Sequence, residues 1–64
     1  MAISMKAARV HAGLTQKQAA KELGMSKSTL ASYESGKTVP KIDVAQQMAS
    51  LYGFTVNEIS FFAY

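Results

Sequence analysis

Apolar residues recur along this chain at the three- and four-residue spacing of a helix. No stretch alternates apolar and polar positions for long enough to predict a sheet. The pattern predicts five short helices, at about residues 4–12, 15–23, 27–35, 42–52 and 55–59, and a glycine follows each of the first four. With 64 residues in all, we expect an all-α fold and one compact domain spanning residues 1–64.

Helix starts are marked by short polar side chains. Thr15 with Gln18, and Thr55 with Glu58, have the spacing of capping boxes, and Ser26 is placed to cap the third helix. The fourth helix has two possible starts, because Asp43 and Gln46 also have capping-box spacing. If it begins near Ile42, its inward positions are Ile42, Ala45, Met48, Ala49 and Tyr52.

Residues 16–35 carry the spacing of a helix-turn-helix. Ala20 is small enough for a second helix to cross closely, and Gly24 can take the positive φ that ends the first helix. Leu30 and Tyr33 turn the apolar side of the second helix inward. The outward strip is polar and lightly cationic, as suits a DNA major groove, and consists of Lys27, Ser28, Ala31, Ser32 and Ser35.

Charge and composition narrow the function. The net charge is +3, but residues 1–41 carry +5 and residues 42–64 carry −2, so the first part suits binding to a polyanion.

There is no cysteine, and His11, the single histidine, has no partners at metal-ligand or triad spacing. We therefore predict no enzyme activity, cofactor, metal or small-molecule ligand. No apolar run reaches the roughly 18 residues of a membrane span, so we expect a cytoplasmic, nucleoid-associated protein.

These residues resemble the phage-repressor and Cro-like (Xre-type) helix-turn-helix family. The matching elements are residues 13–16, the Ala20/Gly24 pair, residues 26–30 and 33–37, Pro40 and residues 51–53. Ala19 departs from the family's usual leucine, and Lys41 stands where a Ser cap is common. The resemblance implies a five-helix, lambda-repressor-like DNA-binding domain, with the helix-turn-helix in its second and third helices.

The predicted DNA-binding residues are Gln16, Lys17, Lys27, Ser28, Thr29, Ala31, Ser32, Lys37, Thr38 and Lys41. Gln16 begins a helix, where family members place a glutamine against the phosphate backbone, although a first-turn residue can also be merely tolerated. Lys27 suits guanine O6 and N7 or a phosphate, and Ala31 suits a thymine methyl group or is filler on a solvated face. Lys37, Thr38 and Lys41 flank the loop that follows the sugar-phosphate strand in this family, or are simply solvated.

Arg9 falls on the inward stripe of the first helix, where an unpaired guanidinium would be costly. Family members pair an arginine and a glutamate at the places of Arg9 and Glu34, so we expect a partly buried ion pair, with a phosphate contact as the alternative for Arg9.

The last six residues contain no charge and three aromatic rings. We expect a homodimer interface at Ile59, Phe61, Phe62 and Tyr64, the alternative being that Phe61 or Phe62 packs internally. The predicted function is transcriptional regulation, most simply repression, by a homodimer on a pseudo-palindromic double-stranded DNA operator. The rival is a protein-interaction module, such as an antitoxin-like domain, with incidental DNA affinity.

Overall fold

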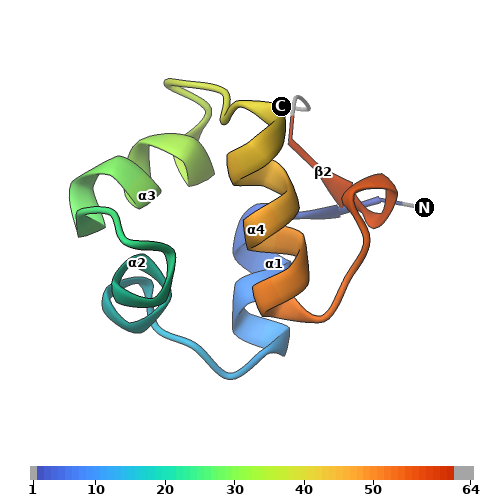
Figure 1. Ribbon diagram of the computed structural model, residues 1–64, viewed down its shortest axis with the longest axis horizontal. Helices are drawn as coiled ribbons and strands as arrows, with labels where there is room; N and C mark the ends of the chain where they lie inside the picture. The colour runs from blue at the N-terminus through green and yellow to red at the C-terminus, as the bar shows by residue number, and fades with distance from the viewer. Residues whose placement is uncertain (1, 62–64) are drawn as a thin grey trace.

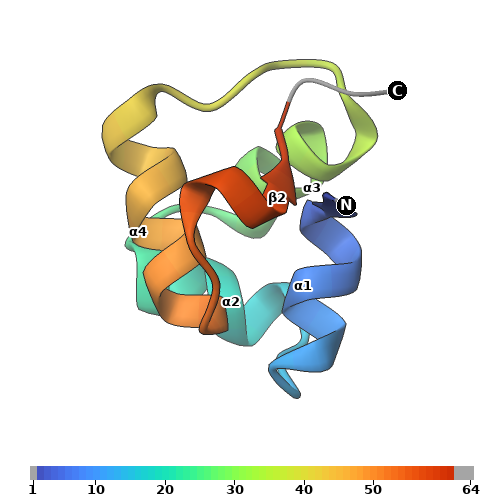
Figure 2. The ribbon, with the colours of Figure 1, turned by 90° about the vertical axis from the view of Figure 1, so that its right-hand side faces the viewer.

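The computed structural model describes residues 2–61. Its elements, in chain order, are β1 (Ile3–Ser4), α1 (Met5–His11), α2 (Gln16–Leu23), α3 (Lys27–Ser35), α4 (Ile42–Tyr52), a 3-10 turn η1 (Val56–Glu58) and β2 (Ile59–Ser60). In Figure 1, α2 and α3 form one side of the molecule, and α1 and α4 lie on the other. Figure 2 shows η1 and β2 passing across α1 and α4 on the side that faces the viewer.

The helices begin where the capping residues predict. Ser4 Oγ accepts from Ala7 N at 3.0 Å, and Ser26 Oγ accepts from Thr29 N at 3.1 Å. Thr15 forms the full capping box with Gln18, since Thr15 N donates to Gln18 Oε1 at 2.9 Å and Gln18 N donates to Thr15 Oγ1 at 3.1 Å. The caps at Thr15 and Ser26 are therefore confirmed, whereas Ser4, predicted as the first helical residue, is the N-cap of α1.

The start of α4 differs from the other three. Lys41 is its N-cap and makes no side-chain capping hydrogen bond. Asp43 lies inside the first turn, where Oδ1 accepts from Val44 N at 2.9 Å, so the alternative start at Asp43 is not used. The first side chain of the helix, Ile42, is 65% exposed, which corrects its predicted inward position. At ~100° per residue it lies about 70° from the centre of the buried face formed by Ala45, Met48, Ala49 and Tyr52.

The predicted fifth helix is a single 3-10 turn, so the described residues form four α-helices rather than five. Glu58 Oε1 accepts from Thr55 N at 2.8 Å and from Thr55 Oγ1 at 3.2 Å, which closes the turn. Ile59 then adopts an extended conformation, with φ −109° and ψ 134°. The helix stops there because the chain begins to pair as a strand.

A small parallel sheet, which the sequence pattern did not predict, joins the two ends of the described chain. Ile3 pairs with Ile59 and Ser4 with Ser60. Each strand is two residues long, too short for an alternating pattern to reveal. The sheet fixes the segment after α4 against the start of α1.

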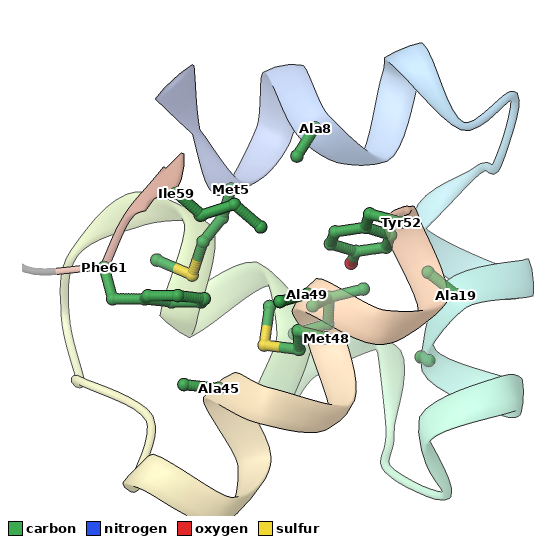
Figure 3. Close-up of a cluster of buried hydrophobic side chains, with 11 residues drawn as sticks. Met5, Ala8, Ala19, Ala45, Met48, Ala49, Tyr52, Ile59 and Phe61 are labelled. Atoms are coloured by element: carbon green, nitrogen blue, oxygen red, sulfur yellow. The ribbon is translucent and has the colours of Figure 1, made fainter. Parts of the chain in front are cut away.

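The core lies between α1, α4 and β2, and Ala19 and Ala20 of α2 and Leu30 of α3 extend it to the helix-turn-helix. Its buried members are Met5, Ala8, Ala19, Ala20, Leu30, Ala45, Met48, Ala49, Tyr52, Ile59 and Phe61. Figure 3 shows the ring of Phe61 turned inward beside Met5, above Ala45.

The burial of two C-terminal residues corrects our expectation for the dimer surface. Ile59 and Phe61 are each only 4% exposed within the single chain. They fall on the same face of the extended segment, two residues apart, and the pairing of β2 with β1 turns that face into the core. Phe62 and Tyr64, the other two predicted dimer residues, lie outside the described residues.

Candidate nucleic-acid interface

The turn between α2 and α3 has the geometry that the helix-turn-helix spacing predicts. Gly24 ends α2 with φ 72° and ψ 29°, and Met25 N then donates to Ala20 O at 2.9 Å. A Cβ built on Gly24 would meet nothing within 4 Å, so glycine is needed for the left-handed conformation and not for space. Ala19 and Ala20 are both buried, which lets α2 lie close to its neighbours.

α3 is anchored by one fully buried residue and exposes most of the opposite face. Leu30 is 0% exposed, whereas Lys27, Ser28 and Thr29 are exposed. Ala31 and Ser32 are half-buried, so they lie lower on the predicted outer strip than Ser28 does. A polar surface of short side chains therefore faces outward along the helix.

A buried network holds α1, α2 and α3 together. Arg9 Nε donates to Glu34 Oε2 at 2.7 Å, and the two side chains are only 9% and 4% exposed. Arg9 Nη1 also donates to Leu14 O at 2.7 Å, in the loop between α1 and α2. The predicted Arg9–Glu34 ion pair is therefore present. The guanidinium of Arg9 is used in this pair and in the bond to Leu14 O, rather than being free for a phosphate.

The network also includes Gln16, for which the sequence predicted a phosphate contact or no specific role. Gln16 Nε2 donates to Glu34 Oε1 at 3.0 Å, and Arg9 Nη2 lies 3.4 Å from the same oxygen. We call the side chains of Arg9, Gln16 and Glu34 with the Leu14 carbonyl the Glu34 network. It ties the first turn of α2 to the last turn of α3, and so fixes the angle between the two helices.

Two shallow hollows divide the predicted DNA-binding residues. The basic hollow is lined by Lys6, Arg9, Leu14, Thr15, Gln16, Lys17 and Lys27. The α3 hollow is lined by Ser28, Ala31, Ser32, Ser35 and Lys37. The structure thus brings Gln16, Lys17 and Lys27 together in one place, and Ser28, Ala31, Ser32 and Lys37 in another. Thr29, Thr38 and Lys41 line neither hollow.

The basic hollow contains a cation that sequence reasoning did not assign to a site. Lys6 lies on α1 and shares the hollow with Lys17 and Lys27 from α2 and α3. The sequence did hold a signal for placing Lys6 in this hollow, because Lys6 lies three residues before Arg9 and therefore on the same side of the first helix. Three lysines and the first-turn backbone N–H groups of α2 make this surface attractive to phosphate.

The segment between α3 and α4 continues the cationic surface. Lys37, Thr38 and Lys41 are all exposed, and Lys37 N donates to Ser32 O at 3.0 Å. Pro40 is buried and Val39 is 41% exposed. The loop is therefore fixed at both ends, with its cations directed to solvent.

Tyr52 borders the Glu34 network from the core side. Its side chain is 3% exposed, and its hydroxyl is buried with no hydrogen-bond partner among the described residues. Figure 3 shows the ring lying inside the core, near Ala49. Burial raises the pKa of Tyr52 to about 12; the Glu34 carboxylate adds to the rise and the Arg9 guanidinium opposes it.

The Helix-turn-helix family model matches residues 5–59, which span all four α-helices and the turn η1. The chain belongs to this helix-turn-helix family. The resemblance to Cro-like, Xre-type proteins is thereby confirmed.

One similar protein is the cryptic phage CTXphi transcriptional repressor RstR of Vibrio cholerae. It is 33% identical to this chain over 51 residues, which cover 80% of this chain and 46% of RstR. The chain therefore spans less than half the length of that curated relative. No solved structure matches the chain.

Two further observations concern chemistry and membranes. Within residues 2–61, no three His, Cys, Asp or Glu side chains gather in a way that could hold a metal ion. In the same part of the chain, none of the helices has the length and apolar character needed to cross a bilayer.

Proposed function

We propose that this chain binds double-stranded DNA sequence-specifically and acts as a transcriptional repressor. Membership in the helix-turn-helix family and similarity to the phage repressor RstR support this function. The observation that carries it is that Lys27 lines the basic hollow while the next residue, Ser28, lines the α3 hollow on the face of α3 opposite the buried Leu30. A phosphate-binding surface here adjoins a surface of short side chains that a major groove can approach.

The two hollows take different parts of the duplex in this proposal. The basic hollow and the cations Lys37 and Lys41 contact phosphates on either side of the groove, and α3 lies between them. Gln16 contacts a phosphate with the amide N–H that the bond to Glu34 leaves available. Ser28, Ala31 and Ser32 face base edges from the α3 hollow.

The chain acts as a homodimer on a pseudo-palindromic operator, with one α3 in each half-site. Two such helices on one face of the duplex are about 34 Å apart, one helical turn of DNA. Because Ile59 and Phe61 are buried in the core of the single chain, other residues form the dimer contact in this proposal.

Selection of bound sites from random duplex DNA tests the proposal. We expect enrichment of a site with two-fold symmetry, bound with a log affinity that falls against log salt by about 0.9 for each phosphate neutralised. Lys17→Gln should reduce that slope by about one phosphate, whereas Lys21→Gln, an exposed lysine of α2 outside both hollows, should change it less. Enrichment of no sequence, with a flat salt dependence, would favour a protein partner instead.

A further inference from the structure

The outer face of α3 has fewer free hydrogen-bonding groups than its sequence suggests. The Thr29 hydroxyl lies 2.9 Å from Ser26 Oγ in the helix cap, and Ser35 Oγ donates to Ser32 O at 3.2 Å. Lys27 lines the basic hollow with other cations. Apart from Lys27, the helix contains none of the side chains that make bidentate contacts with adenine or guanine, namely Asn, Gln, Arg and Lys.

The α3 hollow is mainly apolar, although three of its five lining residues are serines. Ala31 and Ser32 each lie three or four residues from both Ser28 and Ser35, so the four residues share one face of the helix. Ala31 is half-buried in this face and is the one lining residue without a polar side-chain atom. Its methyl group therefore forms a carbon surface below the exposed Ser28.

We propose that the α3 hollow receives the C5-methyl group of a thymine, and that Ala31 is the residue that determines this preference. The inference rests on the proposed DNA-binding function and specifies which base group the α3 hollow recognises. The thymine methyl is the one apolar group that base edges present in the major groove. The hydroxyls of Ser28 and Ser32 can bond to several base edges, so they add affinity with little preference.

Deoxyuridine substitution measures the contribution of that methyl group directly, because deoxyuridine differs from thymidine only by its absence. In the selected duplex, each thymine is replaced in turn and the dissociation constant is measured. We expect one thymine in each half-site at which the change weakens binding about fourfold, the factor that corresponds to about 0.8 kcal/mol for one buried methyl group. At the other thymines we expect little change.

Two Ala31 variants connect the effect to the α3 hollow. Ala31→Gly removes the carbon surface, so thymidine and deoxyuridine should bind equally at the sensitive position. Ala31→Val fills the hollow, so the order should reverse and deoxyuridine should bind better. Ala7→Gly is the matched control, because Ala7 is an exposed alanine of α1 outside both hollows. It carries the same helix penalty and should keep the fourfold ratio.

The outcomes separate this inference from the proposed function. Tight, salt-dependent binding with no sensitive thymine would overturn the inference and leave the DNA-binding function intact. An unchanged fourfold ratio in both Ala31 variants would also overturn it, because another residue would then be reading the methyl group. Failure of the parent chain to bind any selected duplex would defeat both.

Discussion

The two halves of this small domain are held together in different ways. The half made by α1, α4 and β2 contributes most of the large buried side chains, namely Met5, Met48, Tyr52, Ile59 and Phe61. The helix-turn-helix half buries only Ala19, Ala20 and Leu30. It is joined to the first half through those three residues, through the partly buried Leu23, Met25 and Tyr33, and through the hydrogen bonds of the Glu34 network. An element that binds through its outer face can therefore be fixed in angle without covering that face.

The largest expected effect comes from the apolar half. Phe61→Ala should cost about 4 kcal/mol, since it removes a buried ring whose space the neighbouring side chains cannot fill. A domain of this size is stable by only about 3–10 kcal/mol, so this loss removes roughly two fifths or more of the stability. Urea unfolding followed by circular dichroism measures this. Val10→Ala, at a position 58% exposed, is the control and should stay within about 0.5 kcal/mol of the parent.

The next effect comes from the Glu34 network, which joins the two halves. Glu34→Ala should cost on the order of 3 kcal/mol, because it leaves the nearly buried guanidinium of Arg9 without its partner. Replacing both residues together, as Arg9→Met with Glu34→Leu, should recover most of that loss, because no buried charge then remains. Thermal melts of the single and double variants decide the matter. Equal melting temperatures for the parent and Glu34→Ala would contradict the importance given to the network.

Where the two halves meet, stability should depend on pH through Tyr52. Its pKa is raised from 10.0 to about 12, so the folded chain holds the phenol proton more tightly than the unfolded chain does. The contribution of this proton to the free energy of unfolding is fully present below pH 10. It is lost as the pH rises toward 12, and the free energy of unfolding then falls by about 2–3 kcal/mol in total.

Tyr52→Phe should therefore lose less stability than the parent between pH 10 and 12. At neutral pH the two should differ by less than about 1 kcal/mol, because the hydroxyl has no hydrogen-bond partner among the described residues. The two proteins differ only by this hydroxyl, so the difference between their pH profiles isolates Tyr52. Identical profiles would contradict the burial of the hydroxyl.

The smallest effect concerns the start of α4. Lys41 has the extended backbone of an N-cap, with φ −68° and ψ 161°, but no capping side chain. Lys41→Ser should stabilise the domain by about 0.5–1 kcal/mol, whereas Ser26→Ala should destabilise it by about 1 kcal/mol. Ile42→Ser is the control, because it places the same polar side chain at an exposed neighbouring position that is not the N-cap. It should not give the same gain in stability. A Lys41→Ser variant less stable than the parent would argue against a missing cap.

Local chemistry allowed the helices to be predicted closely. Thr15, Ser26 and Gly24 each act within a few residues, and all three appear in the predicted roles. The inward stripe indicated that Arg9 requires a partner, and the resemblance to the family pointed to Glu34, with which Arg9 pairs.

What the sequence did not reveal depends on contacts between distant segments. The pairing of Ile3 with Ile59 involves strands too short to leave a pattern, and it decides that Ile59 and Phe61 face inward. The bond from Gln16 to Glu34 and the shared hollow of Lys6, Lys17 and Lys27 likewise arise only when helices pack. Ile42 lies at the edge of its helix face, where periodicity alone does not settle exposure.

Backbone amide chemical shifts during titration with a selected duplex test the central claim most directly. We predict that the largest changes fall in the first turns of α2 and α3, along the α3 hollow and in residues 37–41. The amides of β1, β2 and the second half of α4 should change little. The largest changes would contradict the account if they fell instead around Glu22, Asp43 and Gln47, which line a separate hollow between α2 and α4.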